Sequence, residues 1–414
     1  MTDHKKPELL APAGSPDILK TAIRYGADAV YIGSPALSLR SGAKNAGTEE
    51  LQECLTFAHA RGKKVYVAVN VYAHEADIRE ARAYFSALKQ ADVIPDAFII
   101  SDPGIFMLAK ELLPQAERHI STQMSTTNAE SFRFWQAQGA SRVVAARELS
   151  LSEIKEIRAA LPEDQEIECF VHGSMCISYS GRCLLSAALT GRSANSGACT
   201  HPCRWSYALE EEKRPGQYFP VEEDARGTYI MNSKDLDMIS YIPELTEAGI
   251  DALKIEGRMK TALYVASVTR AYRLALDAYF EDPESYREKI PWFEEEVRKC
   301  TLRDFTTGFY FGKPDENDVI YTGSTYNKNY IYLGTAGETD ADGLFRLTQK
   351  NKFSVGDTIE IMKPDGKDLA AEVLRIENMD GVPMENCPHA SEELRIRLTE
   401  QTESGDILRM KACI

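Results

Sequence analysis

The sequence lacks an apolar run long enough to form a membrane-spanning helix. None of its stretches approaches the ~20 consecutive apolar residues needed to cross a bilayer. Its first ten residues, MTDHKKPELL, have no apolar core after the lysines, so we expect no signal peptide. These absences predict a cytoplasmic protein with no membrane partner, in a compartment where disulfides are rare.

Positive charge and several familiar motifs are also scarce. The chain has 48 Lys and Arg residues against 63 Asp and Glu, which gives a formal net charge of −15. This balance excludes a surface that binds nucleic acid everywhere, but it leaves room for a local basic patch. The sequence contains no GxGxxG, no GxSxG elbow, no HExxH and no solenoid repeat, so it has none of these signatures of dinucleotide binding, hydrolysis or zinc proteolysis.

What the chain does have is a regular alternation of short apolar runs and amphipathic helical segments. Many of the runs are rich in Val and Ile and are followed by Gly, Ser or Asn, as buried parallel strands are. The alternation predicts an α/β fold with a TIM-like (β/α)8 barrel, and the absence of GxGxxG disfavours the alternative, an open doubly wound sheet. The runs lie at 8–14, 29–33, 64–70, 97–101, 118–122, 142–148, 167–173 and 252–258.

The spacing of the runs also predicts the domain organisation. Residues 174–251 separate the seventh and eighth strands, although a crossover needs only about a dozen residues or slightly more. We therefore expect a barrel domain at 1–305 that carries an insertion at about 174–230. A linker at 306–326 then leads to a small all-β barrel domain at 327–414, where short strands alternate with turns such as DADG and ESGD.

Four of the nine cysteines fall in the predicted insertion. Their pattern is Cys176-x6-Cys183-x15-Cys199-x3-Cys203. Four thiolates are what an iron–sulfur cluster or a structural zinc requires, and the wide first spacing favours a 4Fe–4S cluster. Zinc stays open because Cys199 and Cys203 alone suit a zinc knuckle, and free or redox-active thiols are a third possibility.

Polar residues follow almost every predicted barrel strand, at the end where TIM barrels collect their chemistry. Arg147 and Arg258 are suited to hold a carboxylate in a two-pronged hydrogen bond, so we expect an anionic ligand. The alternative is that both arginines only neutralise the neighbouring acids. The candidate catalytic residues are His172, Arg147, Glu148 and Glu256, and the candidate substrate-binding residues are Arg40, Asn70, Gln123, Arg147, Lys254 and Arg258.

Three motifs together resemble the peptidase U32 family over essentially the full chain. They are ELLAPAGSPD at 8–17, ECFVHGSMCISYSGRCLLS at 168–186 and KIEGRMKT at 254–261. The chain is most similar to the branch that makes 5-hydroxyuridine at the tRNA wobble position. The resemblance implies an iron–sulfur-dependent, oxygen-independent hydroxylation enzyme with a 4Fe–4S cluster on Cys176, Cys183, Cys199 and Cys203. It further implies prephenate as a co-substrate, tRNA as a partner and, in some relatives, a second, shorter U32 protein.

Two other functions stay open at this point. The family name also implies a collagenase-like U32 peptidase, and a structural zinc would suit a non-catalytic binding protein. For RNA contact, Trp205 and Tyr207 are candidates to stack on an exposed base, although aromatic residues in such a loop more often pack against the loop itself.

Overall fold

The computed structural model describes most of the chain in two compact units. The barrel unit comprises Met1–Leu19, Asp28–Met259 and Arg303–Tyr326, and the C-terminal unit comprises Lys20–Ala27, Lys260–Leu302 and Asn327–Ile414. Among the residues it describes, no helix is both long and apolar enough to span a membrane. Those residues are 4–39, 44–176, 178–180, 182–192, 194, 197–205, 208–210, 218–220, 232–300, 303–313, 319–320 and 330–412.

Eight parallel strands form the closed sheet of the barrel unit. They follow one another around the ring in chain order, and the last strand pairs with both the seventh and the first. The predicted TIM-like barrel is therefore confirmed, and the open-sheet alternative is wrong because both edges of the sheet are paired. The strands are β1 (Glu8–Pro12), β2 (Ala29–Gly33), β3 (Lys64–Val69), β4 (Ala97–Ile100), β5 (Glu117–Ile120), β6 (Arg142–Val144), β7 (Glu166–Ser174) and β12 (Ala252–Ile255).

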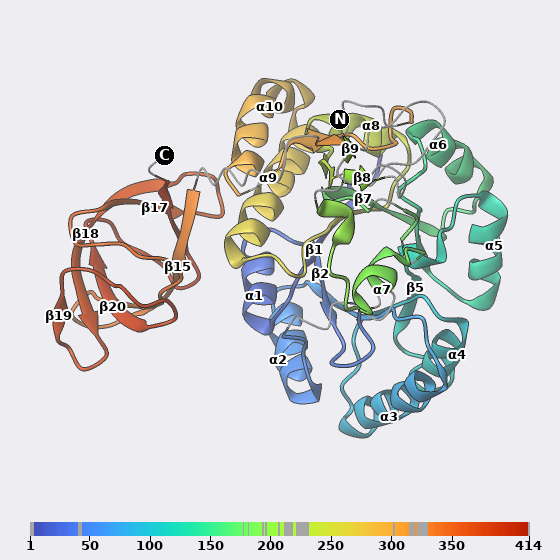
Figure 1. The fold of residues 1–414 in the computed structure, drawn as a ribbon, viewed down its shortest axis with the longest axis horizontal. Coiled ribbons are helices and arrows are strands. Elements are labelled where there is room, and N and C mark those ends of the chain that lie inside the picture. Colours follow the sequence, from blue (N-terminus) through green and yellow to red (C-terminus); the bar gives the residue numbers. More distant parts are fainter. Residues whose placement is uncertain are drawn as a thin grey trace. The chain divides into compact units, whose positions relative to one another are not determined.

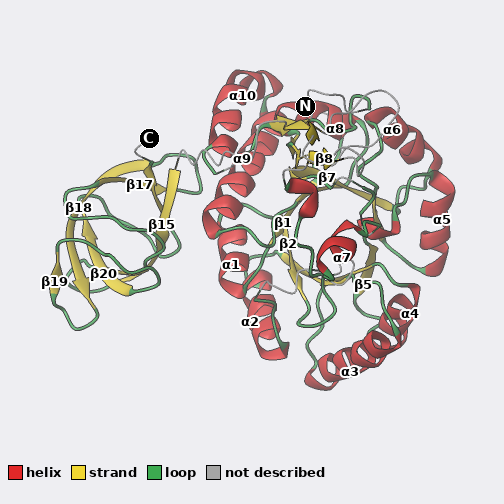
Figure 2. Ribbon diagram, viewed as in Figure 1, coloured by secondary structure: helices red, strands yellow, loops and turns green. Residues whose placement is uncertain are grey.

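Helices connect these strands and lie outside the ring (Figures 1 and 2). Their ends are set by local chemistry: the Asn128 side chain accepts a hydrogen bond from the Ser131 amide, and Gly139 ends the same helix in a left-handed conformation. The connecting helices are α1 (Pro16–Arg24), α2 (Thr48–His59), α3 (Glu75–Ala91), α4 (Pro103–Leu112), α5 (Ala129–Gln138), α6 (Leu151–Ala160) and α8 (Ile242–Glu247).

The insertion between β7 and β12 returns to the barrel through short strands. Strand β11 (Asp235–Asp237) pairs antiparallel with the end of β7 and parallel with β13 (Phe305–Thr306), so it extends the sheet past the rim of the barrel. The other described elements of this region are α7 (Leu185–Thr190), the 3-10 turn Pro202–Arg204, the hairpin β8 (Ala208–Glu210) and β9 (Tyr218–Pro220), and β10 (Asn232–Ser233), which pairs with β14 (Val319–Ile320).

The C-terminal unit contains the predicted all-β barrel. Six antiparallel strands close into a ring through the pairing of β17 with β18, and a short seventh strand lies beside β18. Two helices, α9 (Ala262–Glu281) and α10 (Pro283–Arg298), belong to the same unit. The strands are β15 (Tyr330–Thr339), β16 (Phe345–Thr348), β17 (Thr358–Met362), β18 (Leu369–Asn378), β19 (Pro383–Met384), β20 (Glu393–Leu398) and β21 (Ile407–Lys411).

Candidate functional site

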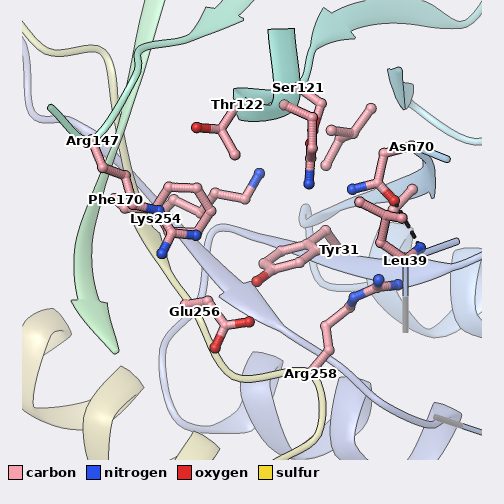
Figure 3. A pocket seen from close by; sticks show the side chains of 13 residues that line it. Tyr31, Leu39, Asn70, Ser121, Thr122, Arg147, Phe170, Lys254, Glu256 and Arg258 are labelled. Atoms are coloured by element: carbon pink, nitrogen blue, oxygen red, sulfur yellow. Dashed lines mark hydrogen bonds between the residues drawn. The ribbon is translucent and has the colours of Figure 1, made fainter. Parts of the chain in front are cut away.

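A small polar cavity lies at the carboxyl ends of the barrel strands. Its volume is about 50 Å³, which is room for several water molecules or a small ligand. Figure 3 shows Arg147, Lys254 and Arg258 around one space, together with Tyr31 and Phe170. The lining residues are Tyr31, Leu39, Ala68, Asn70, Ile99, Ser121, Thr122, Gln123, Arg147, Phe170, Lys254, Glu256 and Arg258.

Arg147 enters the cavity from the loop after β6. One guanidinium nitrogen donates to the carbonyl of Ser174 at 2.8 Å, and the guanidinium carbon lies 4.0 Å from the centre of the Phe170 ring. Its Nε is buried with no hydrogen-bond partner in the part of the chain that the structure describes. A buried donor without a partner costs free energy, so this nitrogen is available to an acceptor on a ligand.

Arg258 lies in the loop after β12 and is 4% exposed. Its position depends on Gly33 at the end of β2, because a Cβ at residue 33 would overlap a guanidinium nitrogen of Arg258. The same Cβ would overlap the Asn45 side-chain oxygen. Glycine at this position therefore provides the space that the guanidinium group occupies.

The two predicted amide side chains also line the cavity, and both are positioned by neighbouring loops. Asn70 accepts a hydrogen bond from the backbone N–H of Leu39 at 3.2 Å. The side-chain oxygen of Gln123 accepts from Ser121, while its backbone oxygen accepts from the Tyr72 hydroxyl at 2.6 Å. These bonds join the loops after β2, β3 and β5 on one side of the cavity.

Lys254 connects the cavity to a chain of buried charges inside the barrel. It is 4% exposed, and its ammonium group donates to Glu168 at 2.5 Å. The other oxygen of Glu168 accepts from Arg142 at 3.3 Å, and Arg142 also binds Glu8 at 2.6 Å and Glu166 at 2.6 Å. Each buried charge thus has a partner of opposite sign, which such charges require.

The environment shifts the pKa of both members of the Lys254–Glu168 pair. Burial lowers the pKa of Lys254, and the cations Arg142 and Arg258 lower it further, in opposition to Glu168. Burial alone opposes the charge of Glu168, but Lys254 and Arg142 together hold its pKa below the usual range. Because two cations share this carboxylate, Arg142 still neutralises Glu168 when Lys254 loses its proton.

Two predicted catalytic residues lie outside the cavity lining. His172 is buried, and its Nδ1 lies 3.2 Å from a carboxylate oxygen of Asp237, the residue opposite it on β11. The return strand of the insertion thus covers this histidine, and the contact between His172 and Asp237 joins β11 to β7. Glu148 is half-buried beside Arg147, and burial raises its pKa. Arg40, a predicted ligand of the substrate, lies outside the described residues.

Of the four clustered cysteines, Cys176 is exposed and the other three are partly buried. The backbone N–H of His201 donates to the Cys199 sulfur at 3.4 Å, and amide hydrogen bonds of this kind are among those that tune iron–sulfur clusters. The donor chemistry fits a soft metal centre. Within the described residues, however, no three His, Cys, Asp or Glu side chains are placed to hold a metal ion, so the four-cysteine centre stays a prediction.

The cysteine-bearing insertion contacts the loops that build the cavity. Gly197, two residues before Cys199, approaches the loop after β2 so closely that a Cβ there would stand 3.0 Å from the Leu39 carbonyl carbon. Arg182 lies over the ring of Tyr72 at 5.5 Å. The insertion therefore lies next to the same loops whose residues line the cavity.

Three residues in or beside the cavity were not predicted from the sequence. Tyr31 and Phe170 supply aromatic walls, and Glu168 supplies the buried counter-charge of Lys254. Tyr31 also donates from its hydroxyl to the Ile255 carbonyl at 3.0 Å. Each of the three lies inside a strand whose neighbours are apolar. The available signal was a single polar or aromatic residue at an inward position of such a strand.

The comparison with known proteins identifies the family. Residues 14–320 match peptidase family U32, and residues 328–409 match the peptidase family U32 C-terminal domain. These two regions cover most of the sequence and both of its units. The chain therefore belongs to the peptidase U32 family, as the three sequence motifs predicted.

Curated relatives within this family carry different names. The chain is 39% identical to tRNA hydroxylation protein P1 of Bacillus subtilis (strain 168), over 98% of this chain and 95% of that protein. It is 38% identical to tRNA hydroxylation protein P of Escherichia coli (strain K12), over 92% of each. A protein named collagenase from Porphyromonas gingivalis is 35% identical, over 79% of each chain.

Proposed function

We infer that this protein hydroxylates tRNA, forming 5-hydroxyuridine at the wobble position in a reaction that depends on an iron–sulfur cluster and on prephenate. The observation that carries this proposal is the cavity at the barrel mouth, where Arg147, Lys254 and Arg258 face one small space. Three cations around a site of this size suit a small acid with more than one carboxylate, and prephenate is a dicarboxylate. The full-length similarity to the tRNA hydroxylation proteins supports the same reaction.

The cysteines of the insertion complete the proposed site. Cys176, Cys183, Cys199 and Cys203 would hold a 4Fe–4S cluster, which supplies electron-transfer chemistry when it is bound. The backbone N–H of His201 already donates to one of these sulfurs. Tyr72 and Leu39, which contact the insertion, also hold Gln123 and Asn70 of the cavity wall, so the two parts of the proposed site share their supports. We further propose that the protein works in the cytoplasm, alone or with a second, shorter U32 protein.

The direct test is a complementation experiment in a bacterium that lacks its own wobble hydroxylation protein. We expect this chain to restore 5-hydroxyuridine, measured by mass spectrometry of nucleosides from purified tRNA, and Arg258→Gln to restore much less. A second strain that also cannot make prephenate should show no restoration until prephenate is supplied. Unmodified wobble uridine in the complemented strain, despite soluble protein, would reject the proposal. Gelatin cleavage by the purified protein would instead favour the peptidase alternative.

Substitution of one clustered cysteine is expected to abolish metal binding. We predict that Cys183→Ala, purified without oxygen, retains almost no iron or acid-labile sulfide, because the cluster loses one of its four thiolates. Cys300→Ala is the matched control, since this partly buried thiol donates to the Val297 carbonyl in the other unit and should leave the iron content unchanged. Equal iron in both variants, or zinc in place of iron and sulfide, would contradict the cluster assignment.

Trp205 is expected to contribute to RNA binding. Its side chain is 47% exposed on the insertion, so part of the ring is open to a base, while Tyr207 lies outside the described residues. Stacking on one base contributes about 1–3 kcal/mol, so Trp205→Ala should weaken tRNA binding by roughly 5- to 150-fold at fixed salt concentration. Phe134→Ala is the control, because Phe134 is exposed to a similar degree, 55%, on helix α5. Equal tRNA affinities in a filter-binding or fluorescence titration would remove Trp205 from the interface.

A further inference from the structure

Lys254 has the surroundings of a nucleophile rather than those of a simple anion-binding residue. Its Nζ lies 4.6 Å from the centre of the Tyr31 ring and 5.3 Å from that of Phe170, so aromatic walls replace water around it. An amine desolvated in this way, with other cations nearby, is more readily deprotonated and more reactive. A buried lysine loses its proton more readily than one in water, and the Lys254 side chain is 4% exposed.

The groups around Lys254 match the two functional groups of a small oxo acid. Arg147 and Arg258 line the same cavity and suit a carboxylate, and the amine suits a carbonyl carbon close to that carboxylate. We propose that Lys254 forms a covalent imine with the carbonyl group of a small 2-oxo acid bound in this cavity. The identity of the acid as a co-substrate rests on the proposed function, but the covalent chemistry is a separate property of the cavity.

The step balances without any reagent from outside the site. The Lys254 nitrogen forms a bond to the carbonyl carbon, and the carbonyl oxygen leaves as water. The ammonium group and the ketone thus become a protonated imine and one water molecule. Glu168, 2.5 Å from the nitrogen, is placed to take a proton from the ammonium group before the attack and to return it to the departing oxygen. While Glu168 holds this proton, Arg142 keeps Glu8 and Glu166 as its partners, and the protonated imine restores the positive charge opposite Glu168 when water leaves.

Glu168 can carry a proton while its second oxygen stays bound to Arg142. Arg142 donates to its second oxygen at 3.3 Å, and Arg142 is itself held by Glu8 and Glu166. The charged groups that act on Lys254 include Glu168, Arg142 and Arg258, and Arg147 and Glu256 line the same cavity. Arginine does not give up its proton, so Glu168, 2.5 Å from the amine, is the group placed to exchange one with Lys254.

Reductive trapping tests the proposal on the full chain. The purified protein is incubated with pyruvate, or with the bulkier phenylpyruvate, and treated with sodium cyanoborohydride, which reduces an imine to a stable secondary amine. We expect one adduct per chain by intact mass, placed on Lys254 by peptide mapping, and none with lactate, which has no ketone. Absence of an adduct with both oxo acids, or adducts spread over surface lysines at the rate seen in unfolded protein, would overturn the proposal.

Two variants separate a reactive lysine from a structural one. Lys254→Arg preserves a cation for Glu168 but should lose the adduct, whereas Lys63→Arg, which alters a lysine paired with Asp28 at 3.0 Å, should retain it. If Lys254→Arg does not fold, mapping of the wild-type adduct still decides the question. An adduct on Lys254 in a protein that fails to hydroxylate tRNA would leave the imine standing and the proposed function rejected. Hydroxylation without an adduct would reject the imine alone.

Discussion

Arg409→Met is expected to lower the free energy of unfolding of the C-terminal unit by about 3–5 kcal/mol, because the substitution leaves buried carboxylates without their partner. The Arg409 side chain is fully buried on β21. It donates to Glu296 of helix α10 at 2.7 Å, to Asp368 at 3.0 Å and to Glu360 at 2.5 Å. Chemical denaturation followed by circular dichroism measures the loss.

The control for this prediction is another arginine of the same β-barrel. Arg397 is exposed on β20, and Arg397→Met should change the free energy of unfolding by no more than about 0.5 kcal/mol. Equal stability of the two variants would show that the buried cluster of Arg409, Glu296 and Asp368 adds nothing that a methionine cannot replace.

The same cluster makes the stability of the C-terminal unit depend on pH. Burial alone would raise the pKa of Glu296, but Arg270 at 2.6 Å and Arg409 outweigh it and lower the pKa to about 2. The contribution of this carboxylate is thus complete above its ordinary pKa of about 4.3 and is lost as the pH falls towards 2. In Arg409→Met this acid-dependent part should shrink.

The barrel was predictable from the sequence because its signals are local. Runs such as AVYIG at 29–33 and KVYVAVN at 64–70 contain the β-branched residues that buried strands prefer, and each run ends in glycine or asparagine. The structure places β2 at Ala29–Gly33 and β3 at Lys64–Val69. Asn128 and Gly139, which lie at the two ends of helix α5, are likewise residue types typical of helix starts and ends.

The site was only partly predictable because its assembly depends on contacts distant in the sequence. Arg147, Lys254 and Arg258 could be placed at the rim from their positions after barrel strands, and all three line the cavity. His172 also follows this rule, yet β11 returns from the insertion and covers it, and no local pattern shows that pairing. Glu168 was missed for the same reason, since its partners Arg142 and Lys254 come from β6 and β12.

Glu168→Gln is expected to destabilise the barrel unit by about 3–5 kcal/mol, the largest effect of any single substitution at the site. Glutamine has the same size but no charge, so Lys254 and Arg142 would face one another in the interior without the anion between them. Glu163→Gln, at an exposed position before β7, should be nearly neutral. Denaturant titrations of both variants at neutral pH provide the comparison.

A double-mutant cycle shows whether the loss arises from the Lys254–Glu168 pair itself. Lys254→Met in the Glu168→Gln background removes the cation that had lost its partner, so the double variant should lose less stability than the sum of the single variants, with a coupling of roughly 0.5–3 kcal/mol. If the two single-variant losses of stability simply add, Arg142 alone neutralises the charge of Glu168. The pKa of Glu168 is held below its usual range, so the wild-type protein should lose the stabilisation from the Lys254–Glu168 pair only when acid protonates the carboxylate. The two variants that carry the Glu168→Gln substitution should show no such loss.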